Sequence, residues 1–197
     1  MTELTRTVVR TAGPGDVAAL QGLVGRASAT TLRRRFHGAG DRIVRREVDR
    51  IAHPSRSHRS WVAVSPDGAV RGTATLAAGR DGTVEAAFLV EDGWFRRGIG
   101  RSLFTALAAE ADCAGVATVL ARVQADNERA IRFLRSLRVG VEAHFVGDGE
   151  VEVQVPVAVA ARRLAPVAPE VAAPPVTPPS TGSGGGSPCP PLVVEAA

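Results

Sequence analysis

The sequence of 197 residues contains no lysine and no tyrosine, only two cysteines, and aromatic residues at 4% of the chain. A P-loop needs Gly-Lys-Ser/Thr, so the absence of lysine excludes that class of phosphate site. Cys113 and Cys189 lie far apart and predict neither a disulfide framework nor a metal site. No apolar run reaches the roughly 18 residues of a membrane span, and no stretch is typical of a signal peptide. We therefore expect a cytoplasmic protein with no metal and no membrane partner.

The charge balance also limits the class of ligand. All 24 basic residues are arginines and oppose 20 acids, which leaves a formal net charge of +4. This balance favours anionic ligands, but the arginines of segment 33–50 lack the interleaved aromatic residues of a nucleic-acid surface, so we expect no nucleic-acid partner. The 45% hydrophobic content suits one globular domain. Proline, alanine, glycine and serine dominate from residue 162, which predicts a folded domain over 1–161 and a disordered tail over 162–197.

Hydrophobic periodicity and turn residues predict an α/β fold. Asp16 is expected to cap the first helix. Strands are expected at 5–10, 61–64, 69–77, 83–91, 116–123, 141–146 and 150–157, and helices at 17–27, 41–51, 101–114 and 126–137. Their order predicts a mixed, mostly antiparallel, twisted sheet of about seven strands flanked by helices.

The segment 84–127 carries the clearest functional signal. It reads as a strand, a turn containing Gly98-Ile-Gly100, a helix and a second strand. A helix start after such a turn points backbone N–H groups and the positive end of the helix dipole at an anion. Three arginines add positive charge around it: Arg96, Arg97 and Arg101. A dinucleotide loop would need a third glycine where Leu103 stands, so the pattern predicts another kind of pyrophosphate ligand.

The phrase Phe95-Arg-Arg-Gly98-Ile-Gly100 resembles the coenzyme A loop of the GNAT superfamily of N-acetyltransferases. That loop reads Gln/Arg-x-x-Gly-x-Gly/Ala and follows a splayed strand. Phe95 departs from the pattern, which should weaken pyrophosphate binding only modestly because main-chain amides make most of the contacts. The resemblance implies acetyl-CoA as cosubstrate. It implies that these residues bind it: Phe88, Leu89, Val90, Phe95, Arg96, Arg97, Gly98, Ile99, Gly100, Arg101 and Asn127.

The helix that follows the second strand has two interpretations. Asn127 and Ala130 resemble the superfamily's Asn-x-x-Ala pattern, in which the asparagine contacts the pantetheine arm, but an asparagine here is also an ordinary helix N-cap. Leu134 stands where the superfamily has the tyrosine that protonates the departing thiolate. Water or another group must then supply that proton.

Glu85 is the candidate catalytic residue. Glu85-Ala-Ala-Phe resembles the Glu-Val-Ala-Phe strand of bacterial protein lysine acetyltransferases, whose glutamate is the general base. A lysine ammonium has a pKa near ~10.4 and must lose a proton before it attacks, which a carboxylate can accept. A lone strand glutamate is otherwise usually solvated. Alternation places Glu85 on one sheet face with Ala87 and Leu89. Glu91 and Asp92 are alternative carboxylates, although Asp92 suits the end of the strand.

The sequence says less about the residues that would bind the acceptor. Ser28 to Phe36 resembles the start of the same acetyltransferase domain, where this segment lies beside the acceptor site, but Arg33 to Arg35 also read as a solvated helix face. We expect acetyl transfer to a primary amine, preferably a protein lysine. The alternatives are a small-molecule amine acetyltransferase and a non-catalytic acyl-CoA sensor, the latter suggested by Phe95 and Leu134.

Overall fold

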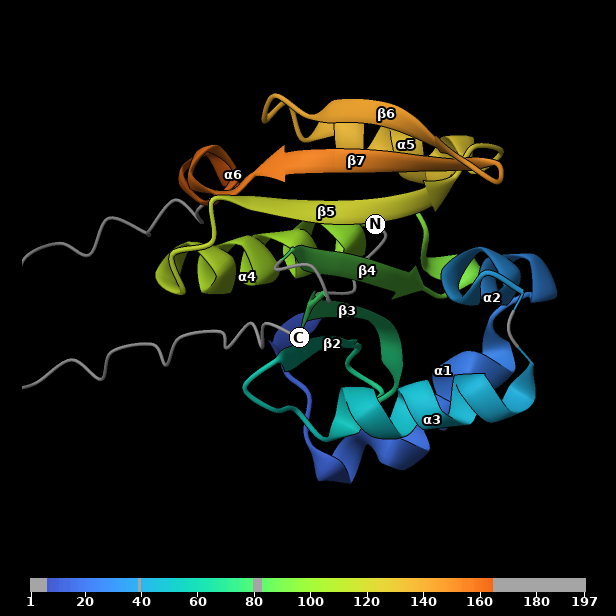
Figure 1. The fold of residues 1–197 in the computed structure, drawn as a ribbon. Helices are drawn as coiled ribbons and strands as arrows, with labels where there is room; N and C mark the ends of the chain where they lie inside the picture. The colour runs from blue at the N-terminus through green and yellow to red at the C-terminus, as the bar shows by residue number, and fades with distance from the viewer. Residues whose placement is uncertain (1–6, 39, 80–82, 165–197) are drawn as a thin grey trace, which may run out of the picture.

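The computed structural model describes residues 7–38, 40–79 and 83–164, which form one sheet covered by helices on both faces (Figure 1). The seven strands are β1 (Val8–Thr11), β2 (His58–Val64), β3 (Val70–Ala78), β4 (Val84–Val90), β5 (Thr118–Gln124), β6 (Glu142–Gly147) and β7 (Glu150–Pro156). The α-helices are α1 (Val17–Arg26), α2 (Ala29–Phe36), α3 (Asp41–Ala52), α4 (Ile99–Cys113), α5 (Glu128–Ser136) and α6 (Val157–Leu164). Two short 3-10 helices are η1 (Pro14–Asp16) and η2 (Asp92–Trp94).

The sheet has the order β1-β2-β3-β4-β5-β7-β6, and only its central pair, β4 and β5, is parallel. The predicted mixed, mostly antiparallel sheet is therefore confirmed. Within the described strands, the pairing of β4 with β5 is limited to Glu85 opposite Leu120. Toward their carboxyl ends the two strands separate, which leaves the backbone groups of β4 that face β5 available to a ligand.

Apolar residues on the two sheet faces explain where the helices pack. Leu103, Leu107 and Ala111 of α4 follow the predicted helical spacing and are fully buried against β2, β3 and β4. Burial of each leucine contributes about 1.5–3 kcal/mol. On the opposite face, α1 and α3 lie together and bury apolar residues that include Leu23 and Ile51 (Figure 1). Helices therefore cover both faces of the part of the sheet formed by β2, β3 and β4.

Helix α2 is attached to the carboxyl end of β4 by polar contacts. Ser28 caps α2, since its Oγ accepts the N–H of Thr31 at 3.2 Å. The Asp92 carboxylate accepts three further hydrogen bonds at 2.8 Å, from the N–H and Oγ of Ser28 and from Oγ1 of Thr31. Burial would raise the pKa of Asp92, but these hydrogen bonds outweigh it and hold the pKa below its usual range. The start of α2 is thus fixed next to the predicted cofactor loop.

Several expectations differ from the structure. Asp16 occupies the N-cap position of α1, as predicted, but its carboxylate makes no hydrogen bond to α1 and instead accepts hydrogen bonds from Arg10 at 2.6 and 2.8 Å and from the N–H of Gly13. The hydrogen bonds from Arg10 lower the pKa of Asp16 despite its burial. The helix near 126–137 is not the last one, since α6 packs Ala160 and Leu164 into the core and spans the boundary predicted after residue 161. The remainder of the predicted tail lies outside the described residues.

Candidate active site

A cavity of about 1010 Å³ lies between the carboxyl end of β4, the amino end of α4, and α5. Its lining contains every residue predicted to bind the cofactor except Arg97: Phe88, Leu89, Val90, Phe95, Arg96, Gly98, Ile99, Gly100, Arg101 and Asn127. The guanidinium of Arg97 lies 4.8 Å from the ring centre of Trp94. The structure therefore brings the predicted set together and leaves one arginine at its edge.

The loop before α4 has the geometry of an anion site. Gly98 has a φ of 83° and Arg96 a φ of 59°, so the chain turns sharply before the helix begins at Ile99. The first N–H groups of any α-helix have no intrahelical acceptor, and here they face the cavity together with Arg101. Gly100 is needed for a packing reason, because a Cβ there would lie 3.3 Å from the ring of Phe133.

Phe95, the departure from the family loop, has a charged partner that the sequence pattern did not indicate. The guanidinium of Arg129, at the start of α5, lies 3.9 Å from the centre of the Phe95 ring, and both residues line the cavity. Arg129 thus supplies a positive charge beside the position where the family loop has Gln or Arg.

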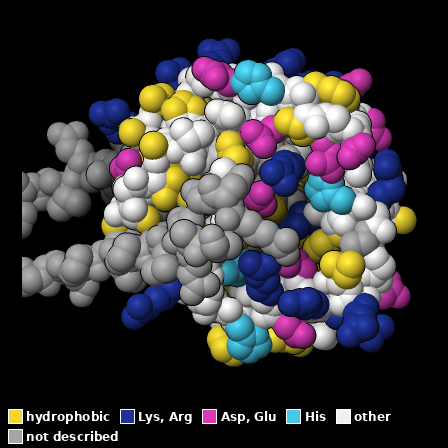
Figure 2. All heavy atoms as spheres, viewed as in Figure 1, with side chains coloured by type: hydrophobic (Ala, Val, Ile, Leu, Met, Phe, Trp, Pro, Cys, Tyr) yellow, Lys and Arg dark blue, Asp and Glu magenta, His cyan; other side chains and the backbone are white. Residues whose placement is uncertain are grey.

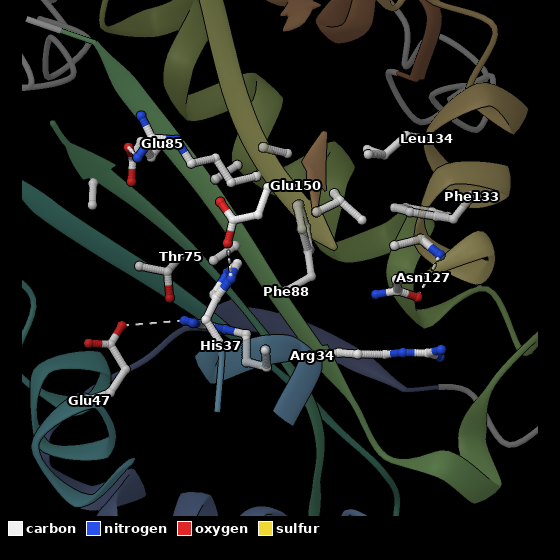
Figure 3. A pocket seen from close by; sticks show the side chains of 18 of the residues that line it. Arg34, His37, Glu47, Thr75, Glu85, Phe88, Asn127, Phe133, Leu134 and Glu150 are labelled. Carbon is white, nitrogen blue, oxygen red and sulfur yellow. Dashed lines mark hydrogen bonds and ion pairs between the residues drawn. The ribbon is translucent and has the colours of Figure 1, made fainter. Parts of the chain in front are cut away.

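A second cavity of about 440 Å³ adjoins the first. Both cavities are lined by Arg34, Arg35, Phe88, Asn127, Ala130 and Phe133. The ring of Phe88 lies 5.9 Å from that of Phe104 and 6.2 Å from that of Phe133, which fixes the wall between the cavities. The two cavities therefore meet beside Phe88. Figure 3 shows this second cavity, with α5 on one side and Glu85 on the other.

Glu85 lines the smaller cavity, as does its face neighbour Ala87. Its side chain is 42% exposed and lies 3.6 Å from the guanidinium of Arg122, which also lies 3.7 Å from Glu152. The predicted face is confirmed, since Leu89 continues it into the core formed with α1 and α3. The carboxylate is thus held at the cavity by one arginine and remains accessible to an incoming amine.

The two alternative carboxylates are engaged in structural contacts. Glu91 is only 12% exposed and binds Arg26 at 2.9 Å and Arg71 at 3.0 Å. Asp92 holds the start of α2, as described above. Neither lines the smaller cavity, whereas Glu85 does. The geometry therefore favours Glu85 among the three.

Both interpretations of Asn127 are compatible with its position. Its Oδ1 accepts the N–H of Ala130 at 3.2 Å and caps α5, and its side chain also lines both cavities (Figure 3). Leu134 is buried in the same wall, with 3% exposure. An apolar surface therefore occupies the place of the family tyrosine.

Several polar residues of the smaller cavity were not predicted. The solvated-face interpretation holds for Arg33, whose side chain is 52% exposed, but is wrong for Arg35, whose side chain is only 12% exposed and lies 3.3 Å from Glu47 of α3. His37 ends α2 in a left-handed conformation and reaches Glu150 of β7 at 2.6 Å. Figure 2, in the orientation of Figure 1, shows acidic, basic and histidine side chains close together on the visible face.

Comparisons with known proteins agree with this geometry. The model of the acetyltransferase (GNAT) family matches residues 27–137, more than half of the chain, so the chain belongs to this family. It is accordingly an acetyl-CoA-dependent acyltransferase. A search of curated protein sequences gave no significant match.

Solved structures share the fold. The GNAT domain of PAT from S. lividans has 21% identity and a TM-score of 0.65, with 79% of this chain and 98% of that chain covered. The acetyltransferase yncA from Salmonella typhimurium, determined with its cofactor acetyl-CoA, has 22% identity, a TM-score of 0.59 and coverage of 77% and 94%. A phosphinothricin acetyltransferase from Sinorhizobium meliloti, in complex with acetyl-CoA, has 19% identity and a TM-score of 0.59. The match covers 76% of this chain and 88% of that chain. At these identities the likeness shows the fold alone.

Within the described ranges, no helix is long and apolar enough to cross a bilayer.

Proposed function

We propose that this protein transfers an acetyl group from acetyl-CoA to a primary amine, with a protein lysine as the preferred acceptor. The observation that carries the proposal is the meeting of two cavities beside Phe88, one at the anion loop and one at Glu85. The donor would place its pyrophosphate on the loop from Phe95 to Gly100 and its pantetheine between β4 and β5. This donor also fits the cytoplasmic location expected from the sequence.

The reaction follows from that placement. Glu85, directly or through water, accepts a proton from the ammonium group, and the neutral amine attacks the thioester carbonyl. A backbone N–H of Leu89 or Val90 donates to the tetrahedral oxyanion, which in other acyl-transfer enzymes is worth about 2.7–4 kcal/mol per donor. The C–N bond forms in this attack, and collapse of the tetrahedral intermediate then breaks the C–S bond.

Coenzyme A leaves as a thiolate and takes a proton from water or from the attacking nitrogen. A thiol has a pKa near ~8.5, so the thiolate is a moderate leaving group without an enzymatic acid. Leu134 should therefore slow this step without preventing it.

A protein lysine is preferred because Glu85-Ala-Ala-Phe88 resembles the catalytic strand of bacterial protein lysine acetyltransferases. A small-molecule amine is the second candidate, because the acceptor cavity of about 440 Å³ lies within the size range of small-ligand sites, about 300–1,000 Å³.

The test is incubation with acetyl-CoA and a panel of amines and proteins, with thiol release and acceptor mass followed together. Because the chain contains no lysine, its own side chains cannot be acetylated on lysine, and only its amino terminus competes with the supplied acceptor. Stoichiometric thiol release and an acetyl mass gain on a protein lysine are expected. No mass gain on any amine would contradict the proposal.

A further inference from the structure

His58, at the start of β2, is an unexplained polar group in the acceptor cavity. It is 2% exposed, lines that cavity, and neither ring nitrogen has a hydrogen-bond partner in the part of the chain that the structure describes. A neutral imidazole carries one N–H donor and one acceptor nitrogen. Buried polar groups are nearly always paired, so a buried ring beside a cavity with both nitrogens unpaired indicates a ligand group that completes the pairing.

The residues around His58 carry an excess of positive charge. Arg35 and Arg50 both lie near the same carboxylate, that of Glu47, at 3.3 and 4.0 Å. The buried Nε of Arg35 also has no partner within residues 7–38, 40–79 and 83–164. Burial, followed by the charge of Arg50, lowers the pKa of His58 to about 4, with Arg35 adding to the effect and Glu47 opposing it. The ring is therefore neutral at pH 7, and two guanidinium groups share one carboxylate.

Two further carboxylates, those of Glu85 and Glu150, line the same cavity, and Glu85 contacts Arg122 while Glu150 contacts His37. In the sheet, Ala77 pairs with His58 on one side and with Glu85 on the other, so the three residues form one row on one face. Two strand spacings separate the ends of that row, about 9–10 Å between backbones. The cavity thus presents the Glu85 carboxylate at one end and, at the other, the unpaired ring of His58 beside two arginines that share the single carboxylate of Glu47.

We propose that His58, Arg35 and Arg50 form a second acceptor subsite that binds a carboxylate carried by the same acceptor whose amine lies at Glu85. The inference rests on the proposed acetyl transfer and narrows its acceptor to amines that also carry a carboxylate. Two sources supply that chemistry: a free amino acid, or a lysine with an acidic side chain beside it in a peptide. In either source the amine is directed to Glu85 and the anion to the arginines.

The test compares acceptors that differ only at the carboxylate. One arm uses 6-aminohexanoate and its primary amide, and the other uses a lysine peptide with Glu or with Gln next to the lysine. Each pair is assayed on wild type, His58→Leu, Arg50→Gln and the control Arg46→Gln, which changes an exposed arginine of the same helix outside the cavity lining. Loss of a hydrogen bond to a charged group predicts a preference for the acid of about tenfold to a hundredfold in kcat/KM.

We expect the preference in wild type and Arg46→Gln, and its reduction to about threefold or less in His58→Leu and Arg50→Gln. If only 6-aminohexanoate is preferred over its amide, the acceptor is a free amino acid. If only the Glu peptide is preferred over the Gln peptide, the acceptor is a lysine beside an acidic residue in a peptide. Equal rates within both pairs in wild type, or an undiminished preference in both site variants, would overturn the subsite. If His58→Leu does not fold, Arg50→Gln decides alone.

A binding measurement separates this subsite from the proposed activity. Thermal shifts are recorded with coenzyme A and either 6-acetamidohexanoate or its amide, neither of which reacts. Stabilisation by the acid alone, lost in Arg50→Gln, supports the subsite even if no amine is acetylated. Equal shifts with acid and amide would refute it, whatever the activity.

Discussion

Replacement of Asp92 by alanine should remove the hydrogen bonds that hold the start of α2 beside the cofactor loop. The carboxylate accepts three hydrogen bonds at 2.8 Å, from Ser28 and Thr31. Hydrogen bonds to charged groups are worth about 1.5–3 kcal/mol each, and partial exposure should reduce the total here to about 2–4 kcal/mol. For a domain of this size, each kcal/mol shifts Tm by about 2–4 °C, so we expect a fall of roughly 5–15 °C. Since Asp92 lines the larger cavity, KM for acetyl-CoA should also rise.

Circular dichroism melting of Asp92→Ala, beside the exposed-site control Asp112→Ala, measures the effect. The folded pKa of Asp92 lies below its ordinary value of 3.8, so its stabilisation is full above pH 4 and is lost as pH falls through the folded pKa. The difference in Tm between Asp92→Ala and wild type should therefore be present at pH 7 and shrink toward pH 3. A Tm at pH 7 within one or two degrees of wild type would refute the role given to these hydrogen bonds.

Three further predictions concern the walls of the two cavities. Gly100→Ala would place a Cβ 3.3 Å from Phe133, so calorimetry should show weaker acetyl-CoA binding than in Gly93→Ala, whose Cβ meets nothing within 4 Å; equal affinities would contradict this. Burial lowers the pKa of His58 from 6.5 to about 4. As the pH falls from 6.5 to 4, this histidine is therefore protonated in the unfolded chain but not in the folded protein, and the wild-type Tm should decrease. His58→Leu should lose that part of the pH dependence, and an unchanged pH profile would argue against a buried neutral ring. Leu134→Tyr should raise kcat, measured by thiol release, because the tyrosine hydroxyl restores a proton donor. The larger side chain should also lower Tm. An unchanged or lower kcat in a folded variant would show that proton donation does not limit turnover.

The cofactor loop could be predicted because its signals are local. Gly98 is required by its positive φ, and the spacing of Leu103 and Leu107 is a property of α4 itself. The Phe95 and Arg129 contact could not be predicted, because the packing of α5 against the loop brings these residues together.

The polar end of the acceptor cavity depended on tertiary structure that the sequence pattern did not contain. Arg35 and Glu47 lie on different helices, and only the packing of α2 near α3 brings them together as a partly buried ion pair. His58 lies outside the strand expected from the sequence, which begins at Trp61, whereas β2 starts at His58. Asp16 has the residue type and position of an N-cap, but Arg10 on the adjacent strand binds it more strongly.

The most direct test of the account is the turnover of Glu85→Gln across pH 7–9. The variant keeps the size and strand position of Glu85 but cannot accept the amine proton. Acetyl-CoA affinity should stay near the wild-type value while turnover at pH 7 falls by about 10²–10⁴, and the deficit should narrow as pH rises toward the pKa of the amine. The control Glu152→Gln removes the other carboxylate near Arg122 and should retain most of the activity. A Glu85→Gln enzyme that matches wild type from pH 7 to 9 would contradict the assignment of Glu85 as the base.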